Sequence, residues 1–510
     1  MKRTAAVISA ILAVIFCLAL LVSCADAGSG DDTTAHQVTA SVESETEPVE
    51  TDKYEIGDLV PSTLKFPDEK IVILSRGRDW CKDEVSAEDD GDRIHAAVFT
   101  RNLVTQDRLG VTIENILLPG SDNYEISEKY IRTQVSGGLN DYSLICASVY
   151  ASIIHTNENL YCDLKAVDNL ELSRPYWFAG FNNAAEYKGS QYFCTGAICL
   201  SLYRFTFATF FNRHTFEEHN QPFLYEAVSK GEWTLDYQNE LITVFYQDVN
   251  GDGVAQDRTD KYGLIANHDM ISVDPYWSSC KLDILGRNDA GEYMYNVDVE
   301  RISTAVEKIT DMFWNNPGTL RIPNESADAE QPTIARLFAE GQSAMTTLRL
   351  IEVEGEAMKN MQDDRGVVPM PKLNKDQDRY YSYVHDTMSA YAIPNTGKSD
   401  EEKNMLGAVL EVMASESYRT ITPAYYEITL KARYVNDVES VSMLDLITDS
   451  IYIDAGILYT KSIDSVHQQM RTFVGKNTPN SVATYFKAEA KKVPKLVSAL
   501  NEGLDSVKGQ

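Results

Sequence analysis

Lys70-Ile71-Val72-Ile73-Leu74-Ser75 is a short apolar run followed by a polar loop, and it decides the fold class. Such a run is typical of a strand that is buried on both faces of a parallel sheet. Beyond the loop, apolar residues recur at the spacing of one helix face: Ile94, Ala97, Val98 and Leu109. Gly110 is placed to end this helix, and Val111-Thr112-Ile113 begins a second strand. The order strand, helix, strand predicts an α/β fold built on parallel sheets.

The alternation of helices and strands continues beyond the second strand. We expect a helix from about Asn123 to Val135 that ends at Gly137-Gly138, followed by a strand over Tyr142 to Cys146. Parallel sheets bind ligands at the carboxyl ends of their strands. The loops after the first and third strands therefore hold the first candidate ligand-binding residues, which are Trp80, Ser148 and Tyr150.

The N-terminus has the pattern of a bacterial lipoprotein precursor. Lys2 and Arg3 precede an apolar run from Thr4 to Val22, and Leu21-Val22-Ser23-Cys24 matches the lipobox at which such precursors are cut and acylated. We expect residues 1–23 to be a signal peptide and Cys24 to carry the lipid. An ordinary signal peptide or a membrane anchor is the alternative, because about 19 apolar residues approach spanning length. The prediction places the protein, lipid-anchored, on the extracytoplasmic face of the cell membrane.

Residues 24–66 have the composition of a flexible tether. Carboxylates, Ser and Thr dominate the stretch from Asp26 to Asp58, Lys53 is its single lysine, and no apolar periodicity appears. A segment of this kind cannot bury enough apolar surface to offset its ordering entropy, so we expect it to be disordered. About 40 residues of flexible coil span roughly 35 Å between their ends.

The remaining chain has the size and charge of a large acidic globular body. The sequence has 510 residues and a formal net charge of -30, so we expect two lobes and no nucleic-acid partner. Beyond the signal region there are six cysteines, whose pairing the sequence does not define: Cys81, Cys146, Cys162, Cys194, Cys199 and Cys280. None of them forms a CxxC motif, which argues against a zinc site.

Five segments, taken in their order along the chain, resemble the family 1 extracellular solute-binding lipoproteins, which serve carbohydrate ABC importers. They are Gly231-Glu232-Trp233-Thr234-Leu235-Asp236, Asp248-Val249-Asn250-Gly251-Asp252-Gly253, Asp260-Lys261-Tyr262-Gly263-Leu264, Phe338 to Met345, and Gly366-Val367-Val368-Pro369-Met370-Pro371. Their order and spacing carry the resemblance, because each segment alone is weakly specific.

The resemblance implies a type II periplasmic-binding-protein fold, with two α/β lobes and a solute cleft between them. By this analogy residues 67–203 with 350–425 form the N-terminal lobe, and residues 204–349 with 426–510 form the C-terminal lobe. The chain would cross the hinge near Ser201 to Phe207, near Thr347 to Ile351, and after about Tyr425. The implied protein is a monomeric binding protein without enzymatic activity or a required cofactor, whose partners are a sugar-like solute and an ABC permease.

The segment from Asp248 to Gly253 has the first half of a calcium loop. Asp248, Asn250 and Asp252 alternate and Gly253 is sixth, but the twelfth position is Thr259 where a full loop has Glu. In the resemblance to alginate-binding proteins, a shortened loop adds three ligands: the Val254 carbonyl, Gln256 and Asp257. The alternative is an ion-free turn, which Asn-Gly and Asp-Gly favour by themselves. Calcium would be structural.

Aromatic and planar polar side chains are the groups that bind sugar rings and hydroxyls. The cluster Asp274-Pro275-Tyr276-Trp277-Ser278-Ser279 is expected to form a loop after a strand, which makes Tyr276 and Trp277 candidates beside Trp80. Further candidates are Arg349, Tyr383, His385 and Asp386. For each aromatic residue, burial in the core is the alternative.

Two other functions remain open at this stage. A lipid-anchored glycan hydrolase would need two carboxylates about 5 to 9.5 Å apart across a cleft, and 76 acidic residues supply too many candidate pairs to discriminate. A solute sensor that docks on a receptor would have the same sequence features as an importer subunit. The sequence does not identify the solute.

Overall fold

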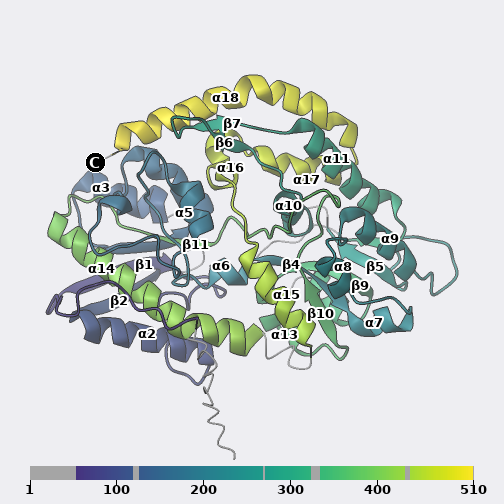
Figure 1. Cartoon of the computed structure of the whole chain (residues 1–510), viewed down its shortest axis with the longest axis horizontal. Coiled ribbons are helices and arrows are strands. Elements are labelled where there is room, and N and C mark those ends of the chain that lie inside the picture. Colours follow the sequence, from purple (N-terminus) through teal and green to yellow (C-terminus); the bar gives the residue numbers. More distant parts are fainter. Residues whose placement is uncertain (1–52, 119–125, 268–269, 323–332, 431–436, 509–510) are drawn as a thin grey trace, which may run out of the picture. The chain divides into compact units, whose positions relative to one another are not determined.

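The computed structural model describes residues 53–118, 126–267, 270–322, 333–430 and 437–508, and these residues contain two main sheets (Figure 1). The signal region, Cys24 and most of the predicted tether lie outside the described residues. Within the described part, no helix combines the length and apolarity needed to cross a bilayer.

The first sheet has four strands in the order β11-β3-β1-β2. Their bounds are β1 (Lys70–Arg76), β2 (Thr112–Leu118), β3 (Leu144–Ser148) and β11 (Ser389–Ala392). β1 pairs in parallel with β2 and β3, whereas β11 runs antiparallel to β3. The three predicted strands and their parallel pairing are confirmed.

Local sequence signals set the ends of the first helix, α2 (Arg93–Leu109). The Asp92 side chain caps its N-terminus by accepting from the backbone N–H groups of Ile94 and His95. Gly110 ends it in the left-handed conformation, with φ of 75°, as its position predicts. The next predicted helix begins among residues that are not described. Its described part is a wider turn over Ile126–Ile131 that continues as α3 (Arg132–Gly137).

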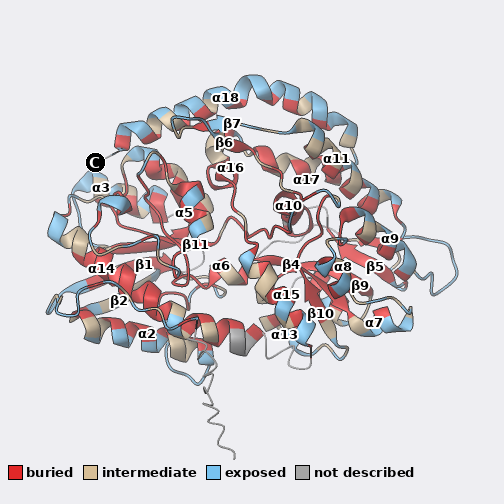
Figure 2. Cartoon of the chain, in the orientation of Figure 1, coloured by how far each residue is buried: buried red, intermediate tan, exposed pale blue. Residues whose placement is uncertain are grey.

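The second sheet has five strands in the order β10-β4-β9-β5-β8. Their bounds are β4 (Phe207–Asn212), β5 (Tyr262–Ala266), β8 (Thr319–Arg321), β9 (Ser343–Arg349) and β10 (Arg365–Val368). β5 pairs in parallel with β8 and β9, while β4 is antiparallel to both β9 and β10. The sheet is therefore mixed. Its central strands are buried along their whole length, as Figure 2 shows.

Three chain segments lie side by side at the junction of the two sheets. The N–H groups of Phe207 and His385 donate to the carbonyls of Tyr383 and Phe205, and Leu350 donates to the Thr206 carbonyl, at 2.9 to 3.0 Å. Between β3 and β4 the chain passes from the first sheet to the second. This stretch includes the expected hinge crossing at Ser201 to Phe207.

The return to the first sheet differs from the expected crossing near Thr347 to Ile351. After β9 the chain turns through Leu350–Glu354 and α13 (Glu356–Lys359), then re-enters the second sheet as β10. Because β10 pairs with β4 and β11 with β3, the return lies between Val368 and Ser389. The lobe boundaries given above stay a prediction.

Helices surround both sheets. α14 (Asp400–Glu416) packs on α2 and begins at the capping pair Ser399 and Glu402. The other helices up to residue 320 are α4 (Val149–Ser152), α5 (Ala179–Ala185), α6 (Ser201–Arg204), α7 (Arg213–Glu218), α8 (Leu224–Ser229), α9 (Leu235–Phe245), α10 (Met270–Ser279) and α11 (Val299–Thr310). Those after it are α12 (Thr333–Ala339), α15 (Val438–Asp449), α16 (Ala455–Leu458), α17 (Gln469–Gly475) and α18 (Val482–Val507).

The long helix α18 contacts elements associated with both sheets. It packs on α11 and on the hairpin formed by β6 (Leu285–Arg287) and β7 (Tyr293–Tyr295), and also on the turn Ile153–Glu158 that follows β3. Figure 1 shows it running above the hairpin, and Figure 2 shows its outer face exposed. The two sheets are thus connected at the junction segments and again beneath α18.

Candidate functional site

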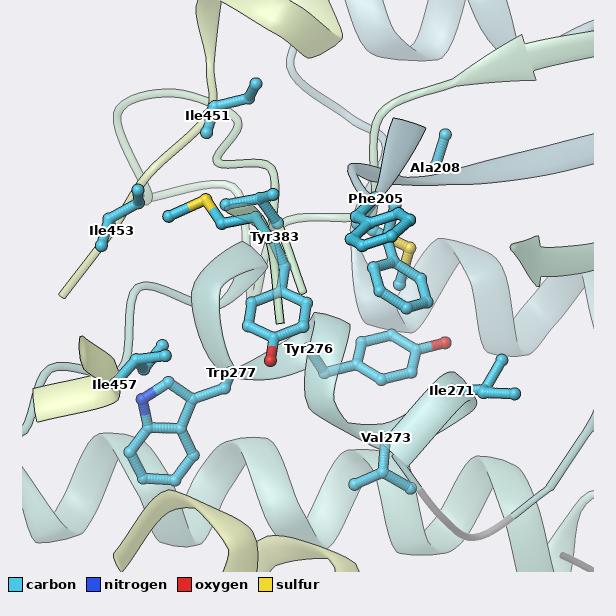
Figure 3. Packing of buried hydrophobic residues seen from close by; sticks show 14 of the residues in the cluster. Phe205, Ala208, Ile271, Val273, Tyr276, Trp277, Tyr383, Ile451, Ile453 and Ile457 are labelled. Atoms are coloured by element: carbon cyan, nitrogen blue, oxygen red, sulfur yellow. The ribbon is translucent and has the colours of Figure 1, made fainter. Parts of the chain in front are cut away.

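The candidate site is a buried polar cluster where the segment from Tyr383 to Met388 meets α10 and the C-terminal segment that runs from the end of α16 into α17. The Tyr383 hydroxyl points toward α10, which carries Tyr276 and Trp277 (Figure 3). His385 and Asp386 follow on the same segment, and each is only 7% exposed. The structure thus brings five of the nine candidate ligand-binding residues into one region, and Ser148 and Tyr150 join them from the end of β3.

The predicted loop around Trp277 is wrong, because Asp274 to Ser279 form the second half of helix α10. Pro275 lies inside this helix. Buried side chains of α10, among them Val273 and Trp277, anchor the helix in the core. The Tyr276 hydroxyl donates to Gln238 Oε1 at 3.0 Å and belongs to the core. The Trp277 ring lies 6.2 Å from that of His467.

A buried acidic pair dominates the electrostatics of the cluster. Asp274 accepts two hydrogen bonds from the guanidinium of Arg471, one of them from Nε at 2.7 Å. Burial, and next the negative charge of Asp274, raise the pKa of Asp386 to about 7. Arg471 and Lys461 oppose this rise. One carboxyl is therefore fixed by a cation, while the other is poised to hold a proton near neutral pH.

The histidines of the cluster are neutral. Burial lowers the pKa of His385 well below 6.5, and the nearby positive charges, Arg349 first, lower it further. Burial, followed by Arg471, lowers the pKa of His467 to about 3. His385 Nδ1 lies 2.5 Å from the Thr387 hydroxyl, and His467 Nδ1 lies 2.9 Å from that of Thr460. Neutral imidazoles offer one donor and one acceptor each, which suits hydroxyl groups.

The end of β3 reaches the same cluster. The Tyr150 N–H donates to the Asp386 carbonyl at 2.9 Å, and the Lys461 ammonium lies 4.4 Å from the centre of the Tyr150 ring. Ser148 pairs with Ser389 in the sheet register and is fully buried. Strand-end residues of the first sheet thus meet side chains from the C-terminal segment.

Trp80 and Arg349 lie together, but with other partners. The Arg349 guanidinium stacks at 4.6 Å over the Trp80 ring and donates to Glu352 Oε1 at 2.8 Å. Trp80 also packs edge-on against Phe205, with 5.6 Å between ring centres. This arrangement ties the first strand loop to the end of β9 and does not pair Trp80 with Trp277.

The buried polar atoms of the cluster without a hydrogen-bond partner among the described residues include Ser148 Oγ, Trp277 Nε1, the Tyr383 hydroxyl and His467 Nε2. An unsatisfied buried polar group costs about 1–3 kcal/mol. Such groups are rare in native proteins and call for a ligand, a water or another partner. Their presence around the acidic pair makes the cluster the candidate site for a polar ligand.

Sequence reasoning did not single out Arg471, His467 or Lys461. Arg471 lies 197 residues from Asp274 in the chain, so no spacing pattern connects them. These residues become recognisable only when the C-terminal segment folds over α10.

An open hollow of about 560 Å³ adjoins the far end of α10, where Gln377 donates to the Ser279 carbonyl at 2.8 Å.

The proposed calcium loop is held by its own hydrogen bonds. Asp248 accepts from the N–H groups of Gly251 and Gly253, and the Asn250 amide donates to Asp252 and Asp257 at 3.0 and 2.9 Å. The Gln256 side chain points elsewhere, because it binds the backbone of Thr319 and Arg321.

Val254, whose carbonyl was the remaining predicted ligand, is exposed. In the described part of the chain, no group of three or more His, Cys, Asp or Glu residues is arranged to hold a metal ion. The predicted ligand set therefore fits calcium only in part.

The fold of the chain is similar to that of solved solute-binding proteins, among them one of an ABC transporter. A cyclo/maltodextrin-binding protein in complex with maltotetraose matches with a TM-score of 0.53 and 12% identity, over 84% of this chain and 98% of the other. UgpB from Mycobacterium tuberculosis in complex with glycerophosphocholine gives 0.52 and 13%, over 82% and 98%. A solute-binding protein from Thermotoga lettingae bound to α-D-tagatose gives 0.51 and 13%, over 84% and 100%.

The type II periplasmic-binding-protein fold expected from the sequence is confirmed by these likenesses. No protein-family model and no curated protein sequence matches the chain.

Proposed function

We propose that this chain is an extracytoplasmic solute-binding protein that captures a carbohydrate and delivers it to an ABC importer. The observation that carries the proposal is the buried polar cluster of a solute-binding fold, with unpartnered atoms on Ser148, Trp277 and His467. A bound polyol would supply hydroxyl groups to satisfy these atoms. Closure around such a solute shifts a pre-existing equilibrium between open and closed forms.

The charge balance of the site supports an uncharged solute. Arg471 is paired with Asp274, and Arg349 is paired with Glu352, so neither cation is left to bind an anionic ligand. The proteins of similar fold are in complex with α-D-tagatose, maltotetraose and glycerophosphocholine, which are two uncharged sugars and one zwitterion. Paired charges and neutral histidines favour the sugar.

The proposed location of the protein and its proposed partners rest on the sequence. Acylation at Cys24 would hold the body near the membrane, and tethering raises its effective concentration at a permease. We propose that the protein works as a monomer. A sensor that presents solute to a receptor would use the same site.

A glycan hydrolase is the alternative that one observation favours. Asp274 and Asp386 are buried close together, and a carboxyl with a pKa of about 7 has the property of a general acid. However, both Asp274 oxygens accept bonds from Arg471, which makes this carboxylate a poor nucleophile or base. Binding without turnover therefore remains the proposal.

The test is a thermal-shift screen of the mature chain with Cys24→Ser against neutral mono- and oligosaccharides, with product analysis of each mixture. A binding sugar at about 100 times its Kd adds about 2.7 kcal/mol of stability, which raises Tm by a few degrees. We expect the sugar to be recovered unchanged. Cleaved glycan would establish the hydrolase, and stabilisation by charged solutes alone would exclude the sugar.

A further inference from the structure

Two buried cysteines of the first sheet lie against each other. Cys146 in β3 faces the core that α14 completes, whereas its neighbours Ile145 and Ala147 face the opposite core. Cys199 belongs to the same core as Cys146, and a hydrogen bond joins the two side chains. We call these two residues the thiol pair, and both are free thiols in the structure. The fold thus brings together two cysteines that are well separated in the sequence.

The segment 194–201 lies along β11 and brings Cys199 to the pair. Its first residue exchanges backbone hydrogen bonds with Tyr391 at 2.8 and 3.0 Å. Its last residue accepts a hydrogen bond from the Ser389 N–H at 2.8 Å. On the other side of β11, Tyr391 pairs with Cys146 in β3. The segment is therefore fixed at both ends, and it holds Cys199 over the face of the sheet that Cys146 occupies.

The thiol pair is sealed in the folded core. Cys199 is 0% exposed and Cys146 is 2% exposed. Burial, and next the hydrogen bond with Cys146, raise the pKa of Cys199 well above 9.0. Because the thiolate is the form that attacks a disulfide, the pair is protected from external reagents while the fold is closed. Oxidation of the pair must therefore occur before its burial is complete.

The remaining cysteines of the described chain have other surroundings. The thiols of Cys162 and Cys194 donate to backbone carbonyls at 3.8 Å. Cys280 directly follows α10 and belongs to the larger core that includes the opposite face of the first sheet. Cys81, in the loop after β1, lies near enough to Cys146 to interact with it electrostatically. Cys81 is therefore the competing partner that a test has to distinguish.

We propose that Cys146 and Cys199 form a disulfide bond while the chain folds outside the cytoplasm. This inference needs the extracytoplasmic location of the proposed function but no solute. Compartments outside the cytoplasm supply the oxidant, which is a low-molecular-weight or protein disulfide. One thiolate of the pair attacks this disulfide and releases the first of its two thiols. The second thiolate attacks the resulting mixed disulfide and releases the other thiol, so the pair loses two electrons and the oxidant gains them.

The bond connects the candidate site to the junction between the sheets. It closes a loop of about 50 residues and stabilises the fold by restricting the unfolded chain. β3 ends at Ser148 and leads to Tyr150 in the site, while Cys199 lies just before α6 and the first crossing. The cross-link therefore holds the strand end of the site beside the chain that enters the second sheet.

The test refolds the reduced mature chain with Cys24→Ser in a glutathione redox buffer and then alkylates the remaining thiols in denaturant. Intact mass counts the alkylated thiols, and a peptide map without reductant identifies the linked cysteines. Cys199→Ser removes the bond, and Cys280→Ser is the matched control because Cys280 is also fully buried. The same map of the chain exported to a bacterial periplasm serves if refolding in vitro fails.

We expect four of the six thiols to be alkylated in the refolded chain, with Cys146 linked to Cys199 in the map. Cys280→Ser should keep the link, and Cys199→Ser should lose it. The oxidised chain should melt a few degrees above the same chain in reductant, whereas Cys199→Ser should melt equally in both. A reduced chain that is already folded should oxidise at least about tenfold more slowly than the refolding chain.

Six alkylated thiols after refolding would overturn the bond, and so would a peptide map that links Cys146 to Cys81. Equally fast oxidation of the folded chain would overturn its formation during folding, since the pair would then be open to external reagents. Failure of every sugar to bind would bear on the proposed function alone, because the mass and the peptide map are measured without solute.

Discussion

At the scale of single residues, the burial of Trp277 changes what its mutation should do. Its indole is 1% exposed and packs in helix α10, although sequence reasoning placed it in an open loop. We expect Trp277→Ala to lower the free energy of unfolding by about 3–5 kcal/mol, since a large cavity replaces the ring. Urea unfolding measures this. A loss of unfolding free energy below about 1 kcal/mol would contradict the burial of Trp277.

Trp277→Phe separates packing from hydrogen bonding at the same position. The substitution keeps an aromatic ring in the core but removes the unpartnered Nε1–H group. If a solute uses this group, sugar affinity falls by about tenfold while most of the stability lost in Trp277→Ala is retained. Isothermal titration with the sugar found in the screen gives the affinity, and unchanged binding would assign Trp277 to packing alone.

Asp386 predicts a pH dependence of stability with a defined sign. Its pKa of about 7 in the folded protein lies above the ordinary 3.8, so folding favours the protonated carboxyl. The stability from this group is present below about pH 4 and is lost as pH rises through 7, by up to about 4 kcal/mol. We expect the difference in Tm between Asp386→Asn and the wild type to shift in favour of the variant as pH rises from 5 to 8. Parallel Tm curves would contradict the buried acidic pair.

At the scale of elements, the loop from Asp248 to Asp257 tests the calcium proposal. The carboxylates of Asp252 and Asp257 both accept from the Asn250 amide, and carboxylate oxygens are among the ligands of calcium. We expect calcium to raise Tm by a few degrees, a chelator to reverse this, and magnesium to have little effect. Asp252→Asn should abolish the response. A Tm that is the same in calcium and chelator would leave an ion-free turn.

The sequence predicted elements well where local signals agreed with their packing. β1, α2 and β3 combine an apolar pattern with clear end signals at Asp92 and Gly110, and they fold as expected. Helix α10 was missed because Pro275 and its polar neighbours indicate a loop, while long-range packing holds them in a helix. Lys461 and Arg471 could not be found, since only the folded C-terminal segment brings them to the site.

At the scale of the whole molecule, Arg204 ties segments from both sheets. Its buried guanidinium donates to Asp83, beyond β1, at 2.9 Å and to Glu354, beyond β9, at 3.2 Å. We expect Arg204→Ala to lower the free energy of unfolding by about 3–5 kcal/mol, because two carboxylates lose their shared cation. Calorimetry should show the main transition shifted down or split in two. An unshifted single transition would mean that this tie is dispensable.

Buried thiols make the molecule report on its own opening. The six cysteines of the described chain are free and buried, and burial raises the pKa of Cys81 and of Cys280 to about 12. Thiol reagents need a thiolate within reach, so native protein stays unlabelled until a segment unfolds. Cys280 directly follows α10, while Cys146 and Cys194 lie within or beside the first sheet. Mass spectrometry of the labelled cysteines would therefore give a separate rate of opening for each half of the molecule, without any introduced probe.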